Sequence, residues 1–121
     1  MKVDEAGCLS DVQFISSPNC DNRPPGNEIR LLVIHNISMP PNVFEGDGVI
    51  DLFTNQLNPN ASYYEAIRNL RVSAHFFVRR DGKIIQFVPC GKRAWHAGKS
   101  CWKGQECCND FSIGVEMEGS D

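Results

Sequence analysis

The sequence has no excess of positive charge, no long apolar run and no export signal. Its 12 Lys and Arg residues are outnumbered by 15 Asp and Glu residues, which gives a net charge of -3 and a pI near 5.6. A general nucleic-acid binder needs a basic surface for phosphate contacts, so that class is excluded. The segment Met1–Gly7 lacks the cationic start and apolar core of a signal peptide, and no window has the apolar length of a membrane helix. We therefore expect a soluble cytoplasmic protein with neither a nucleic-acid nor a membrane partner.

Paired Cys-x-x-Cys motifs are also missing, although the chain has six cysteines. Without such pairs the spacing does not predict a structural zinc site, and adjacent Cys107 and Cys108 cannot easily bridge each other without strain. Because no export signal is seen, reduced thiols are expected. A cysteine hydrolase is disfavoured because no cysteine lies in a nucleophile elbow or at a helix start that would lower its thiol pKa.

The length of the chain bounds its domain organisation. A chain of 121 residues with 41% hydrophobic residues is long enough for one domain with its own core and too short for two. We therefore expect a single domain over residues 1–121. Residues 1–27 are rich in turn formers and proline and show no sustained period, which predicts an irregular N-terminal arm.

The apolar run from Leu31 to Ile34 leads directly into His35 and Asn36. Such a run predicts a strand buried on both faces, at the centre of a sheet with helices on both sides. Central strands of these sheets deliver their C-terminal residues to the crevice that holds the chemistry. His35 is therefore expected at a site, and a hydrogen-bonded structural histidine is the alternative.

The rest of the chain predicts a mixture of helices and strands. The expected elements are a short helix within Asp47–Leu57, a helix from about Ser62 to Leu70 with a Ser-x-x-Glu capping box, a hairpin of 76–78 and 84–88 around Asp81-Gly82, an irregular loop from Gly91 to Asp110, and a strand over 111–118. In the last strand, alternation puts Phe111, Ile113, Val115 and Met117 on one face and Ser112, Gly114, Glu116 and Glu118 on the other.

Three further side chains are candidates for function. Glu116 would be costly to bury as a bare anion, so it needs a partner cation, a metal or a raised pKa; the alternative is a solvated sheet face, which suits Glu118 better. His96, which follows Trp95 in a loop, indicates a recognition surface. For His75, a buried and hydrogen-bonded ring and a functional role are equally consistent with the sequence.

Five motifs stand in order between about Leu31 and Asp121. They are Leu32–Ser38, Arg71–His75, Arg79–Gly82, Lys92–Gly98 and Cys108–Gly119. Together they resemble the AmpD family of bacterial 1,6-anhydro-N-acetylmuramyl-L-alanine amidases, which are relatives of the phage lysozyme-type amidases and of peptidoglycan recognition proteins. Each motif alone is weak, and their order makes the resemblance specific.

The resemblance implies an α/β fold, with a mixed sheet flanked by helices, and a catalytic zinc. The implied reaction is hydrolysis of the amide between 1,6-anhydro-N-acetylmuramic acid and the L-alanine of the stem peptide, in peptidoglycan recycling, with an anhydromuropeptide as substrate. His35 matches a zinc ligand of the family, and Glu116 matches its catalytic acid and base. The positions that match the lining of the substrate groove are Asn36, Arg71, Trp95 and His96.

The chain departs from the family pattern in two ways. The second histidine ligand, a lysine and an aspartate ligand follow a helix beyond the Glu116 strand, so we expect the C-terminal part of the amidase to be missing. The apolar face of Phe111, Ile113, Val115 and Met117 would then form an exposed patch. Cys107 stands where typical members carry an arginine that helps to hold the peptide carboxylate. The alternative function is a non-catalytic muropeptide-binding module or an inactive fragment of the amidase.

Overall fold

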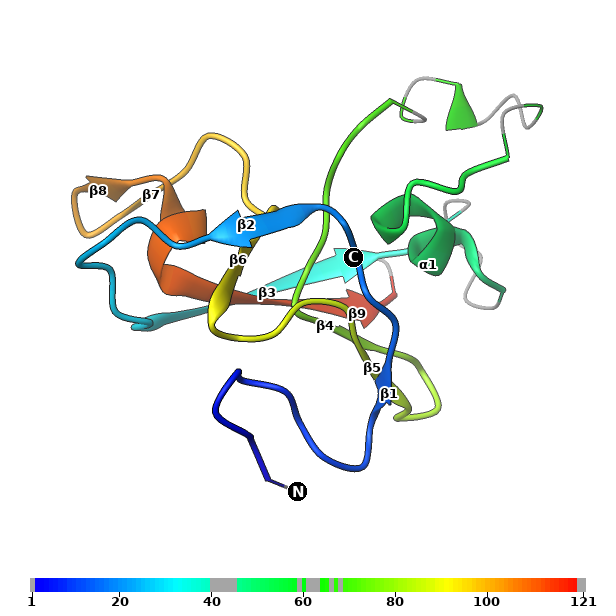
Figure 1. Cartoon of the computed structure of the whole chain (residues 1–121). Coiled ribbons are helices and arrows are strands. Elements are labelled where there is room, and N and C mark those ends of the chain that lie inside the picture. The colour runs from blue at the N-terminus through cyan, green and yellow to red at the C-terminus, as the bar shows by residue number, and fades with distance from the viewer. Residues whose placement is uncertain are drawn as a thin grey trace.

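The fold is built on a mixed sheet of five strands in the order β1-β5-β4-β9-β3 (Figure 1). The computed structural model describes residues 2–39, 46–58, 60, 64–65, 67 and 69–119. The strands of the sheet are β1 (Gln13–Phe14), β3 (Leu31–Ile37), β4 (Phe76–Val78), β5 (Ile84–Gln86) and β9 (Ser112–Glu118). Strand β9 runs parallel to both β3 and β4, whereas β4 and β5 form the expected antiparallel hairpin. The expected mixed sheet is therefore confirmed.

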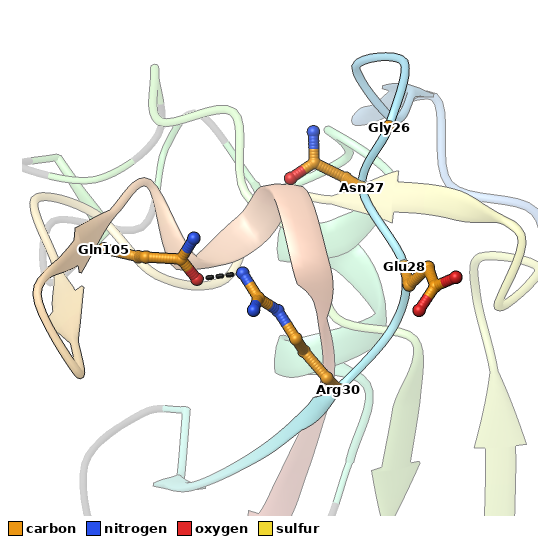
Figure 2. A pocket seen from close by; sticks show the side chains of 5 residues that line it. All are labelled: Gly26, Asn27, Glu28, Arg30 and Gln105. Atoms are coloured by element: carbon orange, nitrogen blue, oxygen red, sulfur yellow. Dashed lines mark hydrogen bonds between the residues drawn. The ribbon is translucent and has the colours of Figure 1, made fainter.

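Smaller elements flank the main sheet. They are the antiparallel pair of β2 (Cys20–Asn22) and β6 (Lys92–Ala94), the hairpin of β7 (Cys101–Trp102) and β8 (Gln105–Glu106), the helix α1 (Gly48–Phe53) and the 3-10 helix η2 (Cys108–Phe111). Helix α1 and the β7–β8 hairpin lie at opposite ends of the molecule (Figure 1). The Arg30 side chain donates a hydrogen bond to Gln105 and so ties the segment before β3 to β8 (Figure 2). Among the described residues, no helix has the length and apolar character needed to cross a membrane.

Two stretches that were expected to be irregular carry strands. Residues 1–27 contribute β1 and β2, and residues 91–110 contribute β6, β7, β8 and most of η2. These strands have two or three residues each, too few for a visible period, and β1, β2 and β6 also pair with strands far away in the chain. The fully buried Gln86 side chain, for example, accepts the Leu9 N–H and donates to the Gly7 carbonyl. Distant pairing, which local patterns do not reveal, orders the N-terminal segment.

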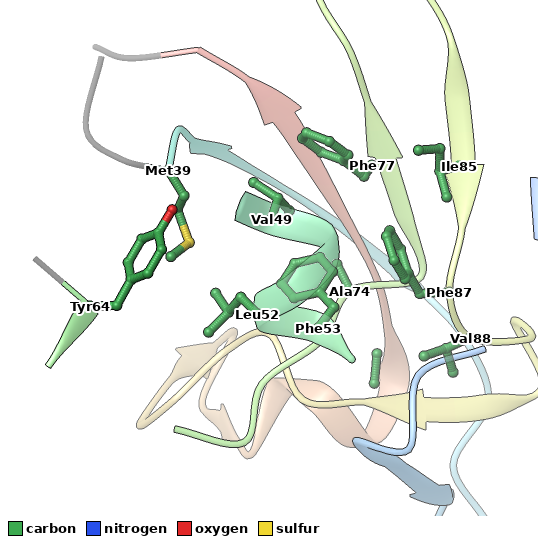
Figure 3. Close-up of a cluster of buried hydrophobic side chains, with 11 residues drawn as sticks. Met39, Val49, Leu52, Phe53, Tyr64, Ala74, Phe77, Ile85, Phe87 and Val88 are labelled. Atoms are coloured by element: carbon green, nitrogen blue, oxygen red, sulfur yellow. The ribbon is translucent and has the colours of Figure 1, made fainter. Parts of the chain in front are cut away.

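Helix α1 covers one face of the sheet and supplies much of the buried core. Its Val49, Leu52 and Phe53 are buried, as expected for side chains spaced three and four residues apart on one helical face. The Phe53 ring meets Phe87 edge to face with 5.1 Å between the ring centroids (Figure 3). The helix lies within the predicted range Asp47–Leu57 and ends at Phe53, before Asn55, which has a positive φ of 61°.

Four of the nine residues of the helix predicted from Ser62 to Leu70 lie outside the described residues, and the capping residue Ser62 is one of them. In the described part, the Ile67 N–H donates to the Tyr64 carbonyl and the Leu70 N–H donates to the Ile67 carbonyl. Both hydrogen bonds span three residues, which is typical of 3-10 turns. Tyr64 is buried against the core beside Met39 (Figure 3).

Strand β3 lies at the edge of the sheet, so the prediction of a central strand buried on both faces is wrong for this structure. Its Leu32 and Ile34 side chains are 57% and 61% exposed. The apolar run does form a strand, but no described residue packs over this face of it. An apolar run therefore predicted the strand correctly and its two-sided burial incorrectly.

On β9 the face with small and polar side chains is the more buried one, which reverses the usual pattern of apolar side chains inside. The small and polar side chains Ser112 and Glu116 point into the molecule, while Met117 is 39% exposed. The expected exposed patch is thus present at Met117, and it continues onto Leu32 and Ile34 of β3. Phe111 was assigned to the patch but is buried, because Trp102 packs beside it and the Arg30 guanidinium lies over its ring.

Candidate active site

His35 and Glu116 lie side by side on neighbouring strands. His35 is on β3 and Glu116 on β9, and the two residues are register partners in this parallel pair. Paired residues of adjacent strands point to the same face of a sheet. Glu116 is also the partner of Phe77 on β4, and Phe77 belongs to the buried core. The two candidates therefore share the covered face of the sheet.

Glu116 is a buried carboxyl group without a hydrogen-bond partner on one of its oxygens. The residue is 8% exposed, and its Oε2 atom has no partner among the described residues. Burial raises the pKa of Glu116 to about 7 because the anion is poorly solvated there. Of the options that the sequence left open for Glu116, the structure shows the raised pKa. A carboxyl group of this kind can both accept and release a proton near neutral pH.

His96 packs on the two neighbouring strands that carry His35 and Glu116. Its Nδ1 atom lies 3.3 Å from Nε2 of His35, and its Nε2 atom lies 3.0 Å from Oγ of Ser112. Its ring also packs against Gly114 of β9, where an added Cβ would come within 2.4 Å of the His96 ring. The structure thus brings three predicted site residues together: His35, His96 and Glu116.

Burial keeps this pair of imidazoles neutral at pH 7. Burial, together with the smaller effects of the nearby His75, His35 and Arg23, lowers the pKa of His96 to about 4. Burial also lowers the pKa of His35. A neutral imidazole has one bare nitrogen, which can accept a proton or bind a metal.

His75 is a buried, hydrogen-bonded structural histidine, one of the two alternatives that its position allowed. It is fully buried, and its Nδ1 atom accepts the Gly114 N–H at 3.0 Å. Its Nε2 atom lies 2.9 Å from the Lys92 carbonyl oxygen. Burial lowers its pKa to about 4, so the neutral ring joins β9 to the start of β6.

The other predicted groove residues lie in different places. The Trp95 side chain donates a hydrogen bond to the Asp21 carboxylate, which contributes to the lowered pKa of that carboxyl after the larger effect of Arg93. Arg71 is exposed before β4. Asn36 alternates with His35 and so lies on the other face of β3, with Leu32 and Ile34. Groove-lining roles for Trp95, Arg71 and Asn36 stay predictions.

A groove of about 510 Å³ runs along β3 next to the histidine pair. Strand β3 forms one side from Leu31 to His35, and residues 96–102 form the other. A second open pocket of about 590 Å³ lies between the segment before β3 and β8 (Figure 2). Its lining residues include no histidine or cysteine, whereas both His35 and His96 line the β3 groove.

Sequence reasoning did not single out Arg23, and it expected a different environment for Glu118. Arg23 donates to the backbone carbonyls of Asn109, Asp110, Cys90 and Ser112, and so fixes the start of β9. It lies in a turn-rich segment that carries no signal for this role. Glu118 was expected on a solvated face, but its side chain is 5% exposed because it forms an ion pair with Arg79 at 2.8 Å.

The described residues do not by themselves make a zinc site. Within them, no group of three or more His, Cys, Asp or Glu side chains could hold a metal ion. A catalytic zinc needs three protein ligands and an open position. His35 and the facing His96 offer the right kind of donor atom, and the unpaired Glu116 oxygen lies on the same face. The set is incomplete within the described part.

The comparisons with known proteins agree with this fold. A family model described as N-acetylmuramoyl-L-alanine amidase matches residues 25–121. The chain therefore belongs to the N-acetylmuramoyl-L-alanine amidase family. Among its relatives is the 1,6-anhydro-N-acetylmuramyl-L-alanine amidase AmpD of Citrobacter freundii, which is 52% identical over 122 residues. The enzyme of the same name from Escherichia coli K12 is 51% identical over 118 residues.

The chain spans somewhat less than two thirds of the length of these relatives. The match covers 100% of this chain and 65% of the Citrobacter protein, and 97% of this chain and 64% of the Escherichia coli protein. A crystal structure of a selenomethionine derivative of AmpD superposes with a TM-score of 0.96 at 51% identity, covering 100% of this chain and 68% of that one. The sheet and the arrangement of its strands are thus those of an AmpD-type fold.

Proposed function

We propose that the protein hydrolyses the amide between 1,6-anhydro-N-acetylmuramic acid and the L-alanine of a stem peptide, in peptidoglycan recycling. The observation that carries the proposal is the buried Glu116, with its pKa raised to about 7, next to His35 at the end of β3. The relatives that match nearly the whole chain are named as amidases of this substrate class. The groove along β3 gives an extended muropeptide a place to lie beside His35 and His96.

Glu116 supplies the proton transfers of the proposed reaction. As the water oxygen bonds to the lactyl carbonyl carbon, Glu116 accepts a proton from the water. The carbon–nitrogen bond then breaks, and Glu116 returns that proton to the amine of the L-alanine. A group whose pKa lies near the working pH performs both transfers without a large energetic penalty. Burial of Glu116 among core side chains is what sets that pKa.

The proposal includes zinc as the cofactor, with His35 as one ligand. The described residues supply only part of such a site, so binding would depend on ligands outside them. Metal analysis of the purified protein and of His35→Ala tests this part directly. Stoichiometric zinc that His35→Ala loses supports it, whereas zinc content independent of His35 contradicts it.

Release of L-alanyl peptide from purified anhydromuropeptide, followed by chromatography, tests the activity. We expect Glu116→Gln and His35→Ala to lower turnover at least about 100-fold. The exposed carboxylate variant Glu5→Gln is the matched control and should keep full turnover. Wild-type turnover in both site variants would show that the assigned roles are wrong. Full activity after thiol alkylation would exclude a cysteine nucleophile.

A non-catalytic muropeptide-binding module is the second candidate, favoured by the incomplete metal-ligand set. Zinc-independent binding without cleavage, abolished by Trp95→Ala, would support it over the amidase.

In either case we propose that residues 1–121 form a single domain, since β1 and β2 join the sheets of the family region. We also propose a cytoplasmic location, where six free thiols such as these are the usual state. Cell fractionation tests that location.

A further inference from the structure

His96 lies in a loop, but hydrogen bonds and close packing hold it in place. Its backbone N–H donates to Oδ1 of Asn109, and the Ala97 N–H donates to the same oxygen at 2.9 Å. The Asn109 amide donates back to the Ala97 carbonyl. The ring lies in a space on β9 that exists because residue 114 has no side chain. His96 is therefore held at both its backbone and its ring.

The hydrogen-bond partners of Ser112 determine which ring nitrogen of His96 carries the proton. Ser112 is fully buried, and the only partner of its hydroxyl among the described residues is Nε2 of His96. If Nε2 carried the proton and donated to Oγ, the hydroxyl hydrogen would be buried without an acceptor, which is costly. If the hydroxyl donates to Nε2, no buried hydrogen is left unpaired. The second arrangement is therefore favoured, and it puts the His96 proton on Nδ1.

That proton faces His35. Nδ1 of His96 lies 3.3 Å from Nε2 of His35, so a protonated Nδ1 donates to a bare Nε2. His35 must then carry its own proton on Nδ1. From this geometry we propose that His96 is a positioning residue: through the relay from Ser112 Oγ to His96 and on to His35, it holds His35 with a bare Nε2. Because the one lone pair of Nε2 accepts this hydrogen bond, Nε2 becomes available to a metal or a proton only when the contact with His96 opens.

This inference rests on the proposed function only for the role of His35 in the reaction. The tautomers of the histidines can be tested without that function. The assignment predicts two kinds of neutral histidine in one protein. His35 and His96 carry the proton on Nδ1. His75 carries it on Nε2, because its Nδ1 accepts the Gly114 N–H and its Nε2 faces the Lys92 carbonyl. His75 is thus an internal reference of the opposite tautomer.

Long-range proton–nitrogen NMR of the whole chain, at slightly alkaline pH with a chelator present, distinguishes protonated from bare ring nitrogens. We expect one histidine with the proton on Nε2 and two with it on Nδ1. A spectrum in which His35 carries its proton on Nε2 would overturn the proposal. The wild-type protein alone decides this point, so the test does not depend on a variant that folds.

Variants separate positioning from a merely structural role. Gly114→Ala should displace the His96 ring and abolish the single-tautomer signature of His35, and Gly119→Ala, where an added Cβ meets nothing within 4 Å, is the matched control. Ser112→Ala should also abolish the signature of His35 and His96, and Ser112→Thr, which keeps the hydroxyl, should restore it. The unchanged His75 signal reports that the fold is intact. An unchanged His35 signature in both Gly114→Ala and Ser112→Ala would contradict the relay.

Zinc binding, measured by competition with a chromophoric chelator, distinguishes this inference from the proposed function. If His35 has the expected tautomer and the protein binds no zinc, the metal part of the proposed function fails and the relay is supported. If zinc binds and His35 carries its proton on Nε2 in the metal-free protein, the relay is overturned and the metal site remains.

Discussion

Glu116 makes the protein less stable in alkaline solution, and Glu116→Gln should remove that effect. Its carboxyl group is buried, and one of its oxygens has no hydrogen-bond partner among the described residues. Glutamine has almost the same shape and no charge. The substitution therefore changes the cost of burying an anion and leaves the packing against the core nearly unchanged.

The magnitude follows from the shift in pKa. Burial raises the pKa of Glu116 from 4.5 to about 7, and this difference is equivalent to about 3 kcal/mol of unfolding free energy. Because the folded state keeps the proton that the unfolded state has released, stability falls as pH rises from 4.5 to about 7 and is constant above that. The stability of Glu116→Gln relative to the wild type should therefore rise by about 3 kcal/mol across this window.

Urea unfolding of both proteins at several pH values, with a chelator present, measures this difference. Effects of other titrating groups are common to both proteins and cancel. Glu118→Gln is the contrasting variant. It breaks the ion pair in which a guanidinium nitrogen of Arg79 lies 2.8 Å from Oε2 of Glu118, so it should lower stability at neutral pH. A stability difference between Glu116→Gln and wild type that is the same in acid and in alkali would refute the reasoning.

Three further predictions concern the rest of the molecule. Arg23→Met removes four hydrogen bonds to backbone carbonyls and should lower the unfolding free energy by at least about 3 kcal/mol in urea, and a loss below about 1 kcal/mol would contradict its role. The pKa values of His75 and His96 are both lowered to about 4, so stability is lost as pH falls from 6.5 towards 4. In Glu116→Gln the thermal midpoint should therefore drop over this range, and a flat profile would count against the burial of these two histidines. Replacing Leu32 and Ile34 by threonine should reduce dye binding and self-association measured by sedimentation, and unchanged association would show that this exposed face is not responsible.

The sequence predicted the elements that have a local signature. The Asp81-Gly82 turn between two apolar runs gave the β4–β5 hairpin, and strict alternation gave β9 with its two faces. The spacing of Val49, Leu52 and Phe53 gave α1. The short strands β1, β2, β6, β7 and β8 have no such signature, because two or three residues cannot show a period. The pairing of β1, β2 and β6 also comes from distant partners.

The candidate site shows the same division. His35 and Glu116 could be chosen from the sequence because burying a polar side chain within an apolar strand costs free energy, so its presence there indicates a function. The tertiary structure alone showed that the two are register partners and that His96 reaches both His35 and Ser112. It also showed that β3 is an edge strand, which its apolar run did not indicate.

By itself, then, the sequence determined the class of fold, the strands that carry the chemistry and the family to which the chain belongs, because these depend on local patterns and ordered motifs. The tertiary structure decided which groups are desolvated and which face one another. Burial, not composition, raises the pKa of Glu116 to about 7 and keeps His35 and His96 neutral. Such effects depend on what surrounds a group in space, and residues far apart in the chain supply those surroundings.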